Sequence, residues 1–397
     1  MQPRFTSVVA ALPATVPFVG PEAQERARGA AFRARLGANE SVFGPSPKAI
    51  AAMREAAAEC WMYCDPENYD LKTALARELG LSPASIVVGE GIDSLFGYTA
   101  RMFTEPGDMV VSSLGAYPTF NFHVAGCGGR LATVPYVDDR EDPASLIEAV
   151  RRERPKLVFF ANPDNPMGSW QPADAVQALI EAVPMDTVVV LDEAYVEFAP
   201  PGTAPPLDVS RPNVIRYRTF SKAYGMAGAR IAYAIAEESV AKSFDKVRNH
   251  FSVNRIAQAG ALAALADKAH LASVLERVAQ ARETIAAIAR AHGLAPLASA
   301  TNFVAIDCGR DGAHAKRVLE GLIAEGVFVR MPGVAPLNRC IRVSAGAPAD
   351  LAAFAEALPK ALGDEPSDAG PGRESARADR RSAQRSPRSP SRQGAGP

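Results

Sequence analysis

The stretch RTFSKAYGMAGAR, residues 218–230, carries the strongest signal in this sequence. It sets Lys222 among small residues and places Arg230 eight positions later. A lysine amine that condenses with an aldehyde needs little bulk around it, and a phosphate beside it is well held by a fixed guanidinium. The apolar residues 231–235 follow at once and predict a strand. By itself the stretch could equally be a surface loop leading into that strand, so its interpretation depends on what precedes it.

Two apolar runs upstream predict strands that are buried on both faces. Residues 188–191 lead into Asp192, and residues 157–160 lead into the turn ANPDNPMG, which contains Asn165. The two Asn-Pro steps of this turn disfavour helix and keep the chain extended. Polar residues at the carboxyl ends of parallel strands usually face the ligand crevice of an open α/β sheet. Each residue alone could be a turn asparagine, a helix cap or a solvated lysine, but together Asn165, Asp192 and Lys222 predict one site at a sheet edge.

Three motifs together resemble the fold-type-I pyridoxal-phosphate aminotransferases of class I/II, and within them most resemble the histidinol-phosphate aminotransferases. The motifs are the Asn-Pro-x-Asn-Pro turn, the pair Asp192 and Tyr195 in Asp-x-x-Tyr, and the Ser-Lys-x-x-Gly-x-x-Gly-x-Arg stretch. The matches extend from NESVFGPSP, residues 39–47, to CIRVSAG, residues 340–346. They cover nearly all of the chain except a tail.

This resemblance implies an α/β fold like that of aspartate aminotransferase, with a mixed, mostly parallel sheet in a large domain and a smaller α+β domain. It also implies pyridoxal 5′-phosphate as cofactor and a ping-pong transfer of an amino group from a small-molecule donor to a 2-oxo acid. Alternating strand and helix patterns agree with such a fold. We expect an N-terminal arm with part of the small domain in residues 1–45, the large cofactor-binding domain in 46–250, and the small C-terminal domain in 251–362.

Residues 363–397 are rich in Gly, Pro, Ser, Asp and Arg. This composition offers too little apolar surface to offset the entropy of ordering, and it predicts a disordered tail. A role of the tail in nucleic-acid binding or in phosphorylation-dependent binding is the alternative. Basic tails without interleaved aromatic residues are usually only solvated.

The resemblance assigns roles around the cofactor ring. Lys222 would join the cofactor aldehyde and later move the proton between the substrate Cα and the cofactor C4′. Asp192 would pair with the pyridine nitrogen and favour its protonated form. Tyr195 and Asn165 would hydrogen-bond the phenolic oxygen of the ring. Tyr117 would stack on the ring face, although a tyrosine in the hydrophobic core would give the same pattern.

The cofactor phosphate requires a separate binding cup. The segment GEGIDS follows a predicted strand and opens a helix at Gly91, so the backbone N–H groups of Ile92 and Asp93 should point toward an anion. The resemblance adds a hydroxyl contact from Ser221 and a charge-assisted contact from Arg230.

By the same resemblance, Arg342 would bind the acidic group of the substrate, and Arg330 would be a second arginine for a substrate phosphate. Both could instead belong to surface ion pairs. Asn39 and Asn302 complete the predicted substrate site. Tyr63 resembles the tyrosine that reaches across a dimer interface to the partner's phosphate, so a homodimer with shared sites is expected.

Several residues depart from the usual family pattern. Met331 follows the second arginine where an acid is usual, Met167 takes the place of a threonine, and Ala229 takes the place of a leucine. These changes remodel the pocket without removing a reactive group. An aminotransferase acting on aromatic or other amino acids, or a pyridoxal-phosphate decarboxylase or lyase, is therefore an alternative. A non-catalytic regulatory module is a third reading.

Composition agrees with an enzyme of this class. The chain has 397 residues, of which 48% are hydrophobic, and its 43 basic and 44 acidic residues leave a net charge of −1. Such a balance predicts neither a nucleic-acid partner nor a membrane surface. The five cysteines show no paired framework, which favours a reducing cytoplasm. Cys60 and Cys64 lack a second pair at zinc-site spacing, and no apolar run reaches eighteen residues, so neither a metal nor a membrane span is expected.

Overall fold

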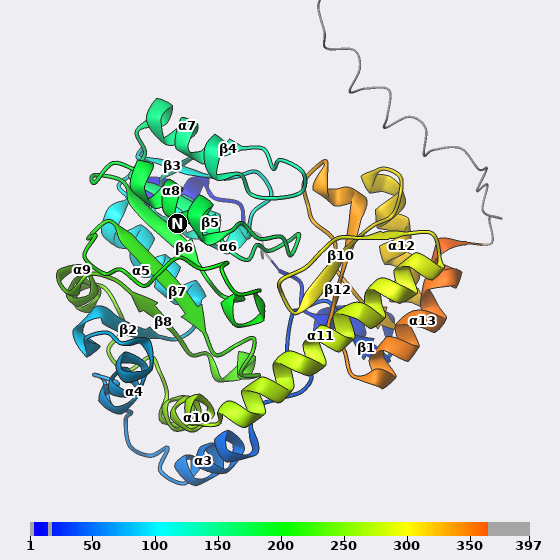
Figure 1. Cartoon of the computed structure of the whole chain (residues 1–397), viewed down its shortest axis with the longest axis horizontal. Coiled ribbons are helices and arrows are strands. Elements are labelled where there is room, and N and C mark those ends of the chain that lie inside the picture. Colours follow the sequence, from blue (N-terminus) through cyan, green and yellow to red (C-terminus); the bar gives the residue numbers. More distant parts are fainter. Residues whose placement is uncertain (1–3, 15–17, 364–397) are drawn as a thin grey trace, which may run out of the picture. The chain divides into compact units, whose positions relative to one another are not determined.

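The apolar runs in the first two thirds of the chain lie side by side in one mixed sheet (Figure 1). Its strand order is β2-β8-β7-β6-β5-β3-β4. Strand β8 is antiparallel to β2 and β7, and the other neighbouring strands are parallel. The predicted mostly parallel sheet is therefore confirmed. The strands are β2 (Ile86–Gly89), β3 (Met109–Ser113), β4 (Arg130–Val134), β5 (Leu157–Ala161), β6 (Val188–Asp192), β7 (Val214–Thr219) and β8 (Ala232–Ile235).

This computed structural model describes residues 4–14 and 18–363, and the chain up to Leu362 forms one compact unit. The predicted disordered tail lies, after Gly363, outside the described residues. The helices are α1 (Ser7–Ala11), α2 (Pro21–Arg28), α3 (Pro47–Ala57), α4 (Tyr69–Leu79), α5 (Ile92–Phe103), α6 (Pro118–Gly126), α7 (Pro143–Glu153), α8 (Ala173–Ala182), α9 (Glu238–Ser243), α10 (Arg255–Ala266), α11 (Lys268–Ala291), α12 (Gly312–Ala324) and α13 (Pro348–Leu362).

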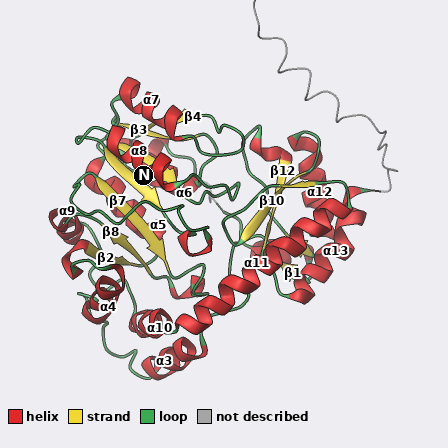
Figure 2. Cartoon of the chain, viewed as in Figure 1, coloured by secondary structure: helices red, strands yellow, loops and turns green. Residues whose placement is uncertain are grey.

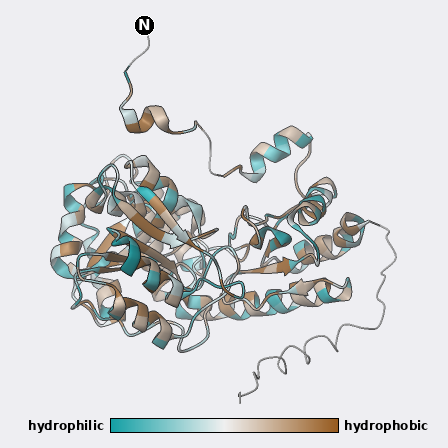
Figure 3. Cartoon of the chain, turned by 90° about the horizontal axis from the view of Figure 1, so that it is seen from above, coloured by the Kyte–Doolittle hydropathy of each residue, from teal (hydrophilic) through white to brown (hydrophobic). Residues whose placement is uncertain are grey.

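Helices cover both faces of the large sheet, which explains why its central strands are apolar throughout. On β5, Phe159 packs with Phe96 of α5, their ring centroids 5.6 Å apart. Its neighbour Phe160 points to the other face and joins a cluster with Leu146 of α7 and Leu179 of α8. Each fully buried phenylalanine contributes about 1.5–3 kcal/mol of hydrophobic free energy. In Figure 3 the central strands of this sheet are correspondingly brown, the colour of apolar residues.

A smaller lobe is built on two further sheets and on α11, α12 and α13 (Figure 2). Strand β10 (Phe303–Asp307) pairs antiparallel with β12 (Cys340–Ser344) and with β9 (Ala295–Pro296). Strand β1 (Ala34–Arg35), from the N-terminal segment, pairs in parallel with β11 (Val327–Phe328). The N-terminal segment is thus tied to the lobe formed by the last third of the chain.

Strand β4 and helices α6 and α8 were not predicted from the sequence. Strand β4 lies at the edge of the large sheet, where only Val134 of its residues is fully buried. It therefore lacks the continuous apolar run that identified the central strands. Helix α6 follows Tyr117 directly and has almost no separation of polar and apolar faces, so its sequence gives no helical periodicity.

Candidate active site

Three polar residues meet where three neighbouring strands end. Strands β5, β6 and β7 lie next to one another, with Ala161 opposite Asp192 and Asp192 opposite Tyr217. Asp192 is the last residue of β6, and Asn165 and Lys222 follow β5 and β7. All three line one cavity of about 400 Å³. The structure thus brings these three predicted residues together at the carboxyl ends of neighbouring strands.

Most of the other predicted site residues line the same cavity, and three do not. Gly91 lies against the Arg230 side chain at the cavity wall. Asn302 is 1% exposed and lies behind Asn39, to whose carbonyl oxygen it donates a hydrogen bond of 3.0 Å. Tyr63 is 78% exposed outside the cavity. The predicted residues that line the cavity are Asn39, Ile92, Asp93, Tyr117, Asn165, Asp192, Tyr195, Ser221, Lys222, Arg230, Arg330 and Arg342.

The Lys222 amine is held at the cavity wall by a backbone carbonyl. Its Nζ donates a hydrogen bond of 3.1 Å to the carbonyl oxygen of Asn39 and lies 5.6 Å from the centroid of the Tyr195 ring. Burial, together with the charges of Arg342 and Arg230, lowers the pKa of this amine to about 8. A substantial neutral fraction is therefore available near neutral pH, as a nucleophilic amine requires.

The Asp192 carboxylate is buried without a cation bound to it. It is 6% exposed, and its Oδ1 accepts a hydrogen bond of 2.9 Å from the Ala194 N–H. Within residues 4–14 and 18–363, no lysine or arginine side chain forms an ion pair with it. Burial raises the pKa of this carboxyl to about 7, with Glu193 adding to the rise and Lys222 opposing it. Such a group is stabilised by any cationic N–H that enters the cavity.

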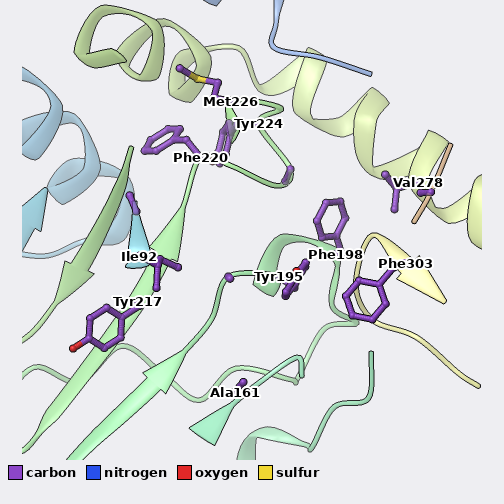
Figure 4. Close-up of a cluster of buried hydrophobic side chains, with 14 of the residues drawn as sticks. Ile92, Ala161, Tyr195, Phe198, Tyr217, Phe220, Tyr224, Met226, Val278 and Phe303 are labelled. Carbon is purple, nitrogen blue, oxygen red and sulfur yellow. The ribbon is translucent and has the colours of Figure 1, made fainter. Parts of the chain in front are cut away.

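Tyr195 is fixed by a short hydrogen-bond chain. Its hydroxyl accepts a hydrogen bond of 3.0 Å from the Asn39 side-chain amide, whose oxygen in turn accepts one of 3.0 Å from the Ser344 hydroxyl. The Tyr195 ring packs edge-on against Phe303 at 5.5 Å, as Figure 4 illustrates. Burial raises the pKa of Tyr195, so its hydroxyl keeps its proton. Asn39 adopts a left-handed backbone conformation with φ of 54°, which asparagine tolerates better than most residues.

Two arginines face the cavity from the smaller lobe. Arg330 and Arg342 lie opposite each other in an antiparallel bridge. Arg342 donates to the Asn165 side-chain oxygen and, at 3.3 Å, to the carbonyl of Gly37. Arg330 donates at 2.8 Å to the Val19 carbonyl. The buried Nε atoms of both arginines have no hydrogen-bond partner in the described part of the chain.

An anion cup lies at the start of α5. Gly91 precedes the helix with φ of 94°, and Arg230 adopts φ of 58° and turns its guanidinium toward Gly91. A Cβ atom on Gly91 would lie 2.3 Å from an Arg230 nitrogen. The Asp93 carboxylate, which would repel an anion, is paired at 2.7 Å with the His123 ring. The helix N-terminus and Arg230 thus face the same end of the cavity.

Phe18 and Glu40 are among the residues that line the cavity and that sequence reasoning missed. The Phe18 ring stacks on Tyr117, with centroids 5.9 Å apart and planes 22° apart, and the Arg330 guanidinium lies 5.3 Å from its centroid. Nothing periodic marks Phe18 in the sequence. Glu40 is exposed and its charge acts on both Lys222 and Arg330. Its position next to Asn39 in the matched NESVFGPSP segment was the available signal.

Among the described residues, no group of histidine, cysteine and acidic side chains is arranged to hold a metal ion. In the same part of the chain, no helix combines the length and the apolar character that crossing a bilayer requires.

Comparisons with known proteins agree with this geometry. Residues 34–358 match the family model of aminotransferase class I and II. The chain is 38% identical over 342 residues to a histidinol-phosphate aminotransferase of Anaeromyxobacter sp., with 85% of this chain and 93% of that protein covered. The crystal structure of histidinol-phosphate aminotransferase from Sinorhizobium meliloti in complex with pyridoxal-5′-phosphate is 55% identical, with a TM-score of 0.89 and coverage of 91% of this chain and 98% of that one.

A more distant solved structure supports the fold alone. A variant of Thermus thermophilus aspartate aminotransferase is 23% identical, with a TM-score of 0.74 and coverage of 90% of this chain and all of that one. The predicted fold class, enzyme class and cofactor are therefore confirmed. This chain belongs to the class I and II aminotransferases, the pyridoxal-phosphate-dependent transferases that its motifs resemble.

Proposed function

We propose that this aminotransferase takes histidinol phosphate as its amino donor and passes the amino group to a 2-oxo acid. The observation that carries the proposal is the pair Arg330 and Arg342, which lie opposite each other and both line the cavity. Two guanidinium groups suit a doubly charged phosphate better than a single carboxylate. The histidinol-phosphate aminotransferases of Anaeromyxobacter and Sinorhizobium meliloti support the same substrate.

The cavity fits pyridoxal phosphate on two observations. The buried Asp192 carboxylate lacks a cationic partner in the described chain, and a protonated ring nitrogen would supply one. At the other end of the cavity, the Arg230 guanidinium lies so close to Gly91 that only a residue without a Cβ atom fits there. We assign Asp192 to the ring nitrogen, Tyr117 to the ring face, and Tyr195 and Asn165 to the phenolic oxygen. We assign the cofactor phosphate to the residues of the anion cup, which are Gly91, Ile92, Asp93, Ser221 and Arg230.

When bound, pyridoxal phosphate supplies an aldehyde that exchanges amines and a ring that accepts electrons. Lys222 supplies the amine and, once free, moves the proton at the substrate Cα. Its lowered pKa of about 8 places it close to the value that suits a general base near neutral pH. Asn39 holds this amine through its carbonyl and positions Tyr195 through its side chain. One residue of the N-terminal segment therefore aligns the base with the hydroxyl that orients the ring.

Replacing Gly91 by alanine should weaken cofactor binding by about tenfold or more, because the new Cβ would collide with Arg230 and strain the positive φ. Gly80→Ala is the matched control, since Gly80 also has a positive φ of 68° but an added Cβ meets nothing within 4 Å. The control should lose stability without losing cofactor affinity. Titration of both cofactor-free variants with pyridoxal phosphate measures the difference, and equal affinities would refute the assignment of this cup.

The substrate assignment is tested with Arg330→Ala. Loss of a charge-assisted hydrogen bond, worth about 1.5–3 kcal/mol, should raise KM for histidinol phosphate by about 10- to 100-fold. The KM for histidinol, which lacks the phosphate, should change much less. Arg151→Ala, an exposed arginine of α7, is the control and should change neither value. Equal losses on both donors, or a wild-type preference for an aromatic amino acid, would overturn the proposal.

We also propose a cytoplasmic homodimer with shared sites. Tyr63 supports this, because it is 78% exposed, lies outside its own cavity and packs at 4.7 Å against Phe251, which is itself 52% exposed. Exposed aromatic pairs of this kind are typical of interfaces. Tyr63→Phe should lower cofactor affinity in the dimer, and sedimentation analysis should report the oligomeric state.

A further inference from the structure

A buried pair of acids lies behind the cavity and has no part in the proposed function. Glu141 is 2% exposed and Asp164 is 1% exposed. Glu141 accepts hydrogen bonds of 2.8 Å from the Ser113 hydroxyl and 3.2 Å from the Ala161 N–H. Asp164 accepts hydrogen bonds of 2.8 Å from the Tyr136 hydroxyl and 3.0 Å from the Met167 N–H, and its carboxyl group interacts with that of Glu141. These contacts fully enclose the two carboxyl groups.

The pair lacks a neutralising partner. In residues 4–14 and 18–363, neither carboxyl forms an ion pair with a lysine or arginine. The charged and titratable groups that act on the pair are Tyr136, Asp192 and Arg342. Two buried carboxyl groups that interact in a low-dielectric interior do not both ionise readily, so at least one proton stays on the pair. Burial accordingly raises the pKa of Asp164 to about 7 and that of Glu141 well above its ordinary value.

The pair is joined to both functional ends of the cavity. The Ala161 N–H that binds Glu141 belongs to the residue opposite Asp192 in the sheet, and the next N–H, of Asn162, donates at 2.9 Å to the Asp192 carbonyl. On the other side, Asp164 anchors the turn that presents Asn165, whose side chain accepts from Arg342. A change in the protonation of the pair can therefore affect both Asp192, the proposed partner of the ring nitrogen, and Arg342, the proposed substrate-binding arginine.

We propose that Glu141 and Asp164 are positioning residues that share one proton and thereby fix both the Asn165 turn and the negative charge behind Asp192. The proposal has two parts, the shared proton and its effect on the cofactor, and the second part rests on the proposed role of Asp192. The first part, the shared proton, is a property of the chain alone.

The shared proton is tested on the full chain with its cofactor removed. An acid whose folded pKa is raised contributes stability that is complete below its unfolded pKa and is lost as pH rises through the folded pKa. The wild-type melting temperature should thus fall between pH 5 and pH 8. In Glu141→Gln/Asp164→Asn this fall should be smaller by at least about 2 °C, because the amides have no proton to lose. Glu148→Gln, an exposed glutamate of α7, should follow the wild type. Parallel curves for all three proteins would overturn the shared proton.

The effect on the cofactor is tested by the visible absorption of the loaded enzyme as a function of pH. Removing a negative charge near the ring disfavours protonation there, so the titration midpoint should fall by about half a unit or more in the double variant. A purely structural role would lower the amplitude or the melting temperature but would leave the midpoint in place, and that result would overturn the coupling. If the wild type bound no cofactor at all, the proposed function would fail, while the melting curves would still decide whether the proton is shared.

Discussion

Lys222→Ala is expected to abolish amino transfer. The substitution removes both the amine that joins the cofactor and the base that moves the Cα proton, and loss of the general base alone costs about 10² to 10⁴ in rate. The variant should still bind pyridoxal phosphate through the anion cup and Asp192, but without the visible band of the lysine-bound cofactor. Single-turnover assays with the preferred donor measure the rate, and absorption spectra measure the band.

A second measurement separates this role from damage to the fold. The folded pKa of Lys222, about 8, lies below that of a free lysine, so the folded chain holds fewer protons than the unfolded chain above pH 8. Stability of the cofactor-free wild type should therefore rise with pH from about 8 to about 10.4, and Lys222→Ala should lose this rise. Lys246→Ala, an exposed lysine, should keep both activity and the rise. An active Lys222→Ala enzyme would remove the basis of the mechanism.

Asp192→Asn is expected to reduce turnover by about 10² or more, the scale on which one preorganised electrostatic contact contributes to catalysis. The amide keeps the shape of the carboxylate and its neighbours but cannot favour a protonated ring nitrogen. The loss should appear in kcat with every amino donor, because it weakens the ring and not the substrate contacts. Steady-state assays with two chemically different donors test this.

The pH dependence of the stability of Asp192→Asn tests the raised pKa of Asp192 independently of the activity assays. The wild-type carboxyl has a raised folded pKa of about 7, so its stabilising contribution is lost as pH rises toward that value. The cofactor-free asparagine variant should therefore be more stable than the wild type above pH 7. Asp186→Asn, an exposed aspartate before β6, should match the wild type in both assays. Unchanged kcat in Asp192→Asn would contradict the assigned contact with the ring.

The strand ends could be predicted because strands buried on both faces appear in the sequence as continuous apolar runs. A strand covered by helices on both faces is apolar along its length, so a polar residue at its end is conspicuous in the sequence, as for Asp192. The helix that begins at Ile92 was marked by the glycine before it. By contrast, β4 at the sheet edge and the arm residue Phe18 carry no periodic pattern, and neither was found.

Contacts between distant segments were the part that sequence could not give. Arg342 and Asn165 were assigned to substrate and cofactor separately, but their mutual hydrogen bond depends on how the two lobes meet. The burial of Glu141 and Asp164 could not be predicted either, because acidic residues in loops are normally exposed to solvent. Only the folded arrangement shows that these two carboxyl groups are buried and act on each other.

Because Asn39 contacts residues of both lobes, neither lobe can be replaced on its own without disturbing the site. The Asn39 carbonyl receives the Lys222 amine from one lobe and the Asn302 amide from the other, while its side chain joins Tyr195 to Ser344. A chimaera that takes its C-terminal third from a relative would keep the cofactor's attachment point yet misalign it, unless the segment carrying Asn39 is transferred as well. Exchange of specificity between such enzymes therefore has to move two pieces of chain that lie far apart in the sequence.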